Sequence, residues 1–261
     1  MAFLVLCTPT LAFLWDRWTR NIWYNGHGLL MPLILGFVAA DALRRRRIAY
    51  EEPSPWGFLF LVPALALIAI DSAIHTELLA AFAMLMALPG LSLLLLGPRR
   101  TRALAFPFAL SFFMLPIPAA FLARVHLFLR ERTAEGTEWV LQMLGFSVYR
   151  EGTTLYLPNG ALQVVEECSG FSALYAGITI ALVLAYMSRS RRRRAVILGV
   201  TFPLALACNV ARVSVLAVLA ETQGYQVLDT PAHVLSGYAT FVLTLAALFL
   251  FAERAPRRAR A

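Results

Sequence analysis

The sequence has no lysine, few charged residues and only three cysteines. All 23 basic residues are arginine, 15% of the 261 residues are charged, and 60% are hydrophobic. A soluble domain of this size has more charge and less apolar content, so the composition indicates a polytopic membrane protein. The formal net charge of +8 does not indicate nucleic-acid binding. Most arginines lie in clusters between apolar runs, which is typical of membrane topology.

The three cysteines have no spacing typical of a disulfide framework or a metal site. Cys7 and Cys208 lie within apolar runs, as packing residues do, which leaves Cys168 as the candidate for chemistry. The sequence also lacks Gly-x-Ser-x-Gly and His-Glu-x-x-His. These absences exclude rhomboid-like and zinc intramembrane proteases, and the residues predict neither a metal nor a cofactor.

Eight apolar stretches predict an all-α polytopic membrane protein, with about eight transmembrane helices in a single domain over residues 1–261. A membrane-spanning helix needs about 20 mostly apolar residues. The first stretch could pass for a signal peptide, but no basic region precedes it, so we interpret it as a short or tilted span. The predicted spans are 3–15, 29–43, 56–70, 78–96, 103–123, 171–187, 195–219 and 232–251.

Arginine is distributed unequally between the two predicted sides of the membrane. Eight spans place both termini on one side, where the segments contain sixteen arginines and four acidic residues. The opposite segments contain six arginines and eleven acidic residues. Because arginine-rich loops stay in the cytoplasm, we predict that both termini are cytoplasmic. The arginine-rich segments are 41–55, 97–102, 188–194 and 253–261.

The segment 124–167, between the fifth and sixth spans, is predicted to be an extracytoplasmic insertion. Residues 133–144 carry apolar side chains at helical spacing, which suits a helix on the membrane surface. Residues 147–165 look extended around Asn159-Gly160, a β-hairpin signal. The insertion is either a lid over the helix bundle or a rim that guides an extended substrate strand towards Cys168 by edge pairing.

Three reactive side chains are predicted to lie at the same outer level of the membrane. Cys168 precedes the sixth span, and if that helix begins near Ser169 its free N–H groups stabilise a thiolate. His233 opens the eighth span, and Arg212 lies within the seventh. An arginine inside a span is costly and by default functional, although its side chain can also snorkel to the interface. A histidine at a helix start is more often structural, but three such residues at one depth favour an active site.

These residue types suit nucleophilic attack on an acyl carbon. The Cys168 thiolate would attack, with His233 as general base and then as acid to the leaving amine. Arg212 would stabilise the oxyanion or hold a substrate carboxylate, because a guanidinium has no useful proton to give. Backbone N–H groups of Ser169 and Gly170 could complete the oxyanion hole.

Asn209 is a candidate for a supporting role. Asn209 lies three residues before Arg212 on the same helix face, where it could orient the guanidinium or bond a substrate carbonyl. Neither Asp229 nor Glu166 is identified as a third member of a catalytic triad.

Several motifs occur in a specific order along the chain. They are Gly26-His27-Gly28, Phe106-Pro107, Pro116-Ile117-Pro118, Glu166 with Cys168-Ser169-Gly170, Asn209-x-x-Arg212 and His233-x-x-x-Gly237. Together they resemble the exosortase/archaeosortase family over nearly the whole chain. The resemblance implies a membrane cysteine transpeptidase or thiol protease that cuts C-terminal sorting tails from exported proteins. Such a tail has a short motif, a transmembrane helix and a basic end, typified by PEP-CTERM proteins in bacteria.

The resemblance also implies roles, partners and location. The family's catalytic Cys, Arg and His match Cys168, Arg212 and His233. The implied partners are tail-bearing membrane proteins, the lipid bilayer, and water or a lipid or glycan amine as acceptor. The implied location is the bacterial inner membrane, with the site on the extracytoplasmic face.

An alternative from another class is a non-catalytic transporter or a subunit of a polysaccharide-export assembly. The polar residues within its helices would then mark a substrate path. A transporter keeps its site near the membrane midplane, whereas Cys168, Arg212 and His233 are predicted at the outer face.

Overall fold

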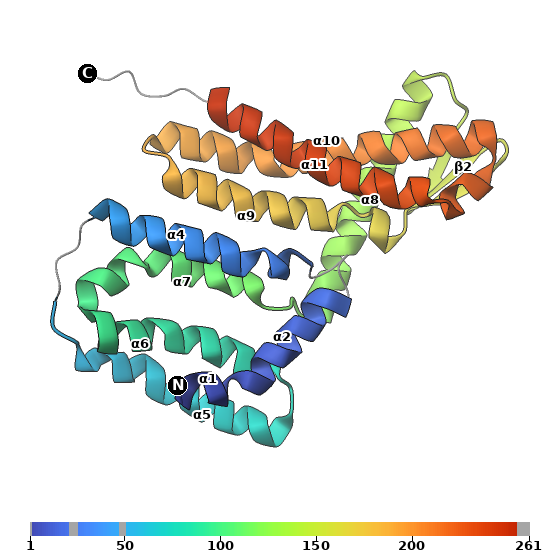
Figure 1. Cartoon of the computed structure of the whole chain (residues 1–261). Coiled ribbons are helices and arrows are strands. Elements are labelled where there is room, and N and C mark those ends of the chain that lie inside the picture. Colours follow the sequence, from blue (N-terminus) through green and yellow to red (C-terminus); the bar gives the residue numbers. More distant parts are fainter. Residues whose placement is uncertain (1, 21–25, 47–50, 255–261) are drawn as a thin grey trace, which may run out of the picture. The chain divides into compact units, whose positions relative to one another are not determined.

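The computed structural model describes residues 2–20, 26–46 and 51–254 (Figure 1). Its helices are α1 Ala2–Leu6, α2 Thr8–Arg20, α4 Met31–Arg46, α5 Phe58–Ile74, α6 Leu78–Ala103, α7 Ala105–Ser111, α8 Ala119–Met143, α9 Phe171–Met187, α10 Arg191–Gln223 and α11 Pro231–Arg254. Short 3-10 turns are η1 Gly26–Leu29, η2 Pro55–Gly57, η3 Phe112–Met114, η4 Glu166–Cys168 and η5 Tyr225–Asp229, and the strands are β1 Tyr149–Glu151, β2 Thr154–Leu157 and β3 Gly160–Gln163. Four arginines of the predicted cytoplasmic clusters, at 47, 257, 258 and 260, lie outside the described residues.

Within the described residues, five helical segments are long and apolar enough to cross a membrane. They overlap the third, fourth, sixth, seventh and eighth predicted spans, so the structure supports an all-α membrane protein without confirming the count of eight. The first predicted span is divided between α1 and α2, and the second corresponds to α4, which has 16 residues. The five segments are Pro55–Ile74, Leu78–Ala103, Glu166–Met187, Arg191–Gln223 and His233–Glu253.

The fifth predicted span, 103–123, is not one helix. It is divided between α7, η3 and the start of α8, with an extended backbone at Leu115 (φ −71°, ψ 138°). Pro116 and Pro118 explain the break. Each lacks a backbone N–H and disfavours the helical conformation of the residue before it.

The helix expected over residues 133–144 is the last part of a much longer one. α8 begins at Ala119 and continues to Met143. The arginines of its first half lie on a regular helix whose buried positions include His126, Leu129, Thr133 and Ala134. Part of the segment predicted as an insertion is therefore a main helix of the fold.

The extended part of the segment forms a small antiparallel sheet in the order β1-β2-β3. The turn between β2 and β3 comprises Pro158 and Asn159, with Leu157 opposite Gly160. Side chains alternate across the sheet, as the period of a strand requires. Leu155, Leu157 and Leu162 are buried on one face, and Tyr149 and Tyr156 stack on the other with ring centroids 6.1 Å apart.

Contacts divide the chain into two compact units, Met1–Pro116 and Ile117–Ala261. In the first, α5 packs along α6, and the Trp18 indole N–H donates to the Met114 carbonyl at 3.1 Å. All of the predicted site residues belong to the second unit.

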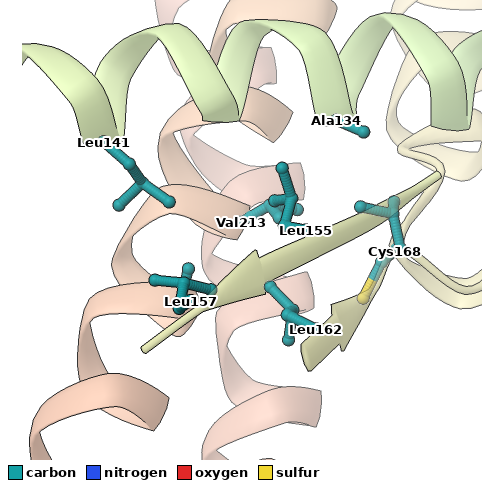
Figure 2. Close-up of a cluster of buried hydrophobic side chains, with 9 residues drawn as sticks. Ala134, Leu141, Leu155, Leu157, Leu162, Cys168 and Val213 are labelled. Carbon is teal, nitrogen blue, oxygen red and sulfur yellow. The ribbon is translucent and has the colours of Figure 1, made fainter. Parts of the chain in front are cut away.

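In the second unit, α10 is the central element and packs against α8, α9 and α11 (Figure 1). Its N-terminus is capped by Ser190, whose hydroxyl accepts from the Arg193 N–H at 3.4 Å. A buried apolar cluster lies where α8, the sheet and α10 meet, and Cys168 is at its edge (Figure 2). The cluster contains Ala134, Leu141, Leu155, Leu157, Leu162, Val164, Cys168, Val213 and Ala217.

Candidate active site

Cys168 ends the turn η4, just before helix α9. That helix begins at Phe171, slightly later than the expected start near Ser169. The N–H of Cys168 donates to the Val165 carbonyl, and the N–H of Ser169 donates to the Glu166 carbonyl, both at 3.0 Å. The Cys168 side chain is 7% exposed.

His233 is in direct contact with the thiol. Its Nε2 lies 2.8 Å from Cys168 Sγ, although the two residues are 65 positions apart. His233 is the third residue of α11, which begins at Pro231, and its N–H donates to the Thr230 carbonyl at 3.2 Å. Proline suits the first helical position because no hydrogen-bonded N–H is needed there. The start of α11 thus presents the imidazole to the sulfur.

Arg212 connects the turn that carries the thiol to the start of α11. Its Nη1 donates to the Glu167 carbonyl at 3.4 Å, its Nη2 to the His233 carbonyl at 3.2 Å, and its Nε to the Ser236 hydroxyl at 3.0 Å. A guanidinium has five N–H donors, so two remain for a ligand within the described structure. The side chain is 8% exposed.

Asn209 contacts the thiol turn rather than the guanidinium. Its side-chain Nδ2 donates to the Cys168 carbonyl at 2.8 Å and to the Thr133 hydroxyl at 3.0 Å. The residue is 1% exposed. One amide hydrogen thus holds the backbone of the nucleophile and the other binds α8. An arginine could bond only the amide oxygen of Asn209, and this oxygen has no hydrogen-bond partner among the described residues. Asn209 therefore does not orient Arg212 in this structure.

The remaining predicted residues flank these groups. The Ser169 N–H is engaged with Glu166, whereas the Gly170 N–H has no acceptor within the described residues. Gly170 has φ +76° and packs against Asn209, because a Cβ on it would lie 2.7 Å from Asn209 Cγ. Gly237 follows Ser236 on α11, and the side chain of Glu166 is exposed.

No carboxylate within the described residues is hydrogen-bonded to His233, so the Cys168–His233 pair has no acidic third member there. Instead, the His233 carbonyl accepts from both Arg212 and Ser236, the latter at 2.7 Å. Ser236 was missed in the sequence, where a serine three residues after a histidine carries no distinct signal. In the same part of the chain, no group of three or more His, Cys, Asp or Glu side chains could hold a metal ion.

α8 also contributes polar contacts that the sequence analysis missed. His126 Nδ1 lies 2.8 Å from Ser169 Oγ, and Arg130 Nε donates to the Val164 carbonyl at 2.6 Å. The available signal was their spacing with Thr133, which places all three on one face of a helix. An apolar crevice lies next to this turn; it is lined by Leu129, Ser169, Gly170, Leu174, Phe202, Ala205 and Leu206.

The arrangement provides a thiol, an adjacent proton acceptor and a nearby fixed positive charge, which are the groups required for acyl transfer through a cysteine. No curated protein and no solved structure matches the chain. The model of one protein family, described as Transmembrane exosortase (Exosortase_EpsH), matches residues 15–250. This match covers most of the chain and confirms the resemblance inferred from the motifs. The chain therefore belongs to the transmembrane exosortase family.

Proposed function

We propose that this protein is a membrane-embedded cysteine transpeptidase or endopeptidase that cleaves C-terminal sorting tails through a Cys168 thioester. The observation that carries the proposal is the 2.8 Å contact between Cys168 Sγ and His233 Nε2 beside the Arg212 guanidinium. Family membership indicates the class of reaction. The substrate is a membrane-anchored protein whose tail has a PEP-CTERM-like motif, a transmembrane helix and a basic end.

In the acylation step, the proton of the Cys168 thiol passes to His233 Nε2. The sulfur attacks the carbonyl carbon of the scissile peptide bond, and the carbonyl oxygen becomes an oxyanion. When this intermediate collapses, the C–N bond breaks, His233 returns the proton to the leaving amine, and the tail departs with its transmembrane helix. The body of the substrate remains attached to Cys168 as a thioester.

In the second step, water or an amine on a lipid or glycan attacks the thioester carbonyl. His233 takes the proton of the attacking group, the C–S bond breaks, and His233 returns the proton to the sulfur, which regenerates the thiol. Attack by water makes the enzyme a protease, and attack by an amine makes it a transpeptidase.

Arg212 and Gly170 have donors suited to the oxyanion. Arg212 is held by three acceptors, so its charge is fixed before the reaction begins, and electrostatic stabilisation depends on such preorganisation. The Gly170 N–H can act as a second donor. Asn209 maintains the position of the nucleophile through the Cys168 carbonyl.

The proposed location is the bacterial inner membrane, with both termini cytoplasmic and the site on the extracytoplasmic face. The unequal distribution of arginine supports this orientation. A sorting tail anchored in the same bilayer would hold its motif at the membrane surface, at the level proposed for Cys168.

The function is tested by co-expression with a reporter protein that carries a PEP-CTERM-like tail. The wild-type protein should shorten the reporter, and the Cys168→Ala variant should not. Cys208→Ala is the matched control, because Cys208 is a half-buried free cysteine on α10 that is hydrogen-bonded to none of the three site residues in the described structure. Shortening of the reporter by Cys168→Ala would refute the mechanism.

A further inference from the structure

One face of α8 carries three polar side chains that are hydrogen-bonded, directly or through Asn209, to the segment 164–169, which contains the nucleophile Cys168. His126, Arg130 and Thr133 are separated by four and three residues, a spacing that aligns side chains on one helix face. His126 is 3% exposed and Thr133 is fully buried. Buried polar groups are costly unless they are hydrogen-bonded, so the partners of these three side chains indicate their role.

The first partner is Ser169, the residue after the nucleophile. Ser169 Oγ lies 2.8 Å from His126 Nδ1 and also accepts from the Phe171 N–H at 3.3 Å. The His126 ring contacts the Phe171 ring, with centroids 4.9 Å apart. Burial lowers the pKa of His126, an effect opposed by Glu166 and Glu167 and increased by Arg130.

The second and third partners lie before the nucleophile and at the nucleophile itself. Arg130 Nε donates to the Val164 carbonyl at 2.6 Å, and its Nη2 donates to the Thr153 hydroxyl at 3.1 Å. Thr133 accepts from Asn209 Nδ2, which also donates to the Cys168 carbonyl. α8 therefore anchors the segment at Val164, at Cys168 through Asn209, and at Ser169.

The nucleophile turn needs such anchors because its internal bonding is slight. η4 has three residues, and the backbone then passes through the left-handed Gly170. Short 3-10 turns have poorer hydrogen-bond geometry than α-helices. The contact between Cys168 Sγ and His233 depends on where this turn lies, and small displacements of reacting groups are expensive in rate.

We propose that α8 positions the nucleophile, with His126, Arg130 and Thr133 as positioning residues that fix Cys168 against His233. This proposal rests on the proposed function for its kinetic consequence, but its structural content concerns the thiol alone. None of the three residues needs to touch the substrate.

The test compares two threonines on the same face of α8. Thr133→Val removes the acceptor of Asn209, and Thr133→Ser retains it. Thr137 is the control, since it is fully buried, lies one turn further along, and its hydroxyl has no partner among the described residues. Thr133→Val should lower kcat for reporter cleavage by roughly tenfold with little change in KM, which corresponds to one lost hydrogen bond. Thr133→Ser should restore most of the rate, and Thr137→Val should leave it unchanged.

A second pair tests the bond to Ser169. His126→Leu should lower kcat, and His126→Asn should restore part of it, because an asparagine amide can take the place of Nδ1. If Thr133→Val and Thr137→Val give the same rate, or if losses follow the unfolding temperature and not the presence of a hydrogen-bonding group, the proposal is wrong.

A measurement without substrate separates this proposal from the proposed function. In a Cys7→Ser, Cys208→Ser background, iodoacetamide alkylates Cys168 at a rate that reports its contact with His233. Thr133→Val should slow alkylation several-fold at pH 7 and progressively less as the pH rises and more thiolate forms without a base, while Thr137→Val should not slow it. Failure of the wild-type protein to cleave any tail would refute the proposed function, and the alkylation rates would still decide whether α8 positions Cys168. Equal alkylation profiles would overturn the positioning role even if tails are cleaved.

Discussion

Arg212 and His233 share a hydrogen bond but have different chemical tasks. Arg212 donates to the carbonyl groups of Glu167 and His233, whereas the His233 imidazole contacts the sulfur of Cys168. The fork of the guanidinium matters as much as its charge, since lysine offers its donors from a single point. His233 is needed only at pH values where the Cys168 thiol does not lose its proton by itself. The two residues should therefore be separable by pH.

His233→Ala should show a defect that eases as pH rises, because more thiolate then forms without a base. Arg212→Lys should lower activity by roughly two to three powers of ten at every pH, the magnitude expected for loss of an oxyanion donor. The measurement is the rate of reporter cleavage against pH for both variants, in membranes or detergent. Identical profiles, with neither variant improving at high pH, would contradict this division of roles.

Asn209 offers a sharp test because its two candidate roles predict opposite results for one substitution. Asn209→Asp keeps the shape of the side chain but loses both Nδ2 donors, which hold Cys168 and Thr133. The buried carbonyl would then lack its donor, so activity should fall by about tenfold or more. If Asn209 instead served to orient Arg212, a carboxylate would do so at least as well. Wild-type rates for Asn209→Asp would thus contradict the observed contacts.

At the scale of elements, the site is formed by the starts of two helices and by the middle of a third. Cys168 precedes α9, His233 opens α11, and Arg212 lies within α10. The turn before α9 is tightest at Gly170, where the backbone is left-handed and Asn209 packs closely. A non-glycine residue at this position would be destabilised in two ways, by the left-handed backbone and by the clash of its Cβ with Asn209.

Gly170→Ala and Gly145→Ala separate these penalties. Gly145 also has a positive φ, of +86°, but a Cβ on it would meet nothing within 4 Å. Gly145→Ala should lower the free energy of unfolding by about 1–2 kcal/mol, the cost of a left-handed backbone, and retain activity. Gly170→Ala should lose more stability and nearly all activity, because the new Cβ displaces Asn209. Thermal unfolding and reporter cleavage give the comparison, and equal effects of the two variants would refute it.

The elements also show how far sequence reasoning reaches. Cys168 and His233 could be singled out because each stands where a polar stretch gives way to an uncharged helix, and Arg212 because it interrupts an apolar run. The role of α8 could not be predicted. The first residues of α8 continue an apolar run, so they were assigned to the fifth span. Its polar residues were assigned to the insertion, and they share one face only once the whole segment is known to be a helix. Asn209 shared a face with Arg212 by spacing, but spacing does not give the direction of a side chain towards a neighbouring turn.

At the scale of the whole molecule, the composition was sufficient to indicate a membrane protein, and the motifs were sufficient to indicate its family. The number of spans was harder to predict, since apolar length alone does not show where a proline pair interrupts a helix. Prolines 116 and 118 divide a stretch that reads as one span. The arginine distribution predicts orientation only together with the number of spans, because that number decides which segments share a side.

Orientation is tested by labelling a single cysteine in the sheet. Tyr156 is 43% exposed, and Tyr156→Cys in a Cys7→Ser, Cys168→Ala, Cys208→Ser background offers one reactive thiol. An impermeant maleimide added to intact cells, with the outer membrane permeabilised, should label it. Labelling only after the cytoplasmic side is opened would reverse the orientation and place the site on the wrong face for exported substrates.

The central claim is that the substrate is carried on Cys168 as a thioester. It is tested most directly by an acid quench of the wild-type protein during reporter cleavage, followed by mass spectrometry of the peptide that contains Cys168. That peptide should carry the new C-terminus of the reporter, hydroxylamine should remove it, and Cys168→Ala should yield neither the adduct nor a shortened reporter. An acyl group on another residue, or a reporter shortened by Cys168→Ala, would contradict the account.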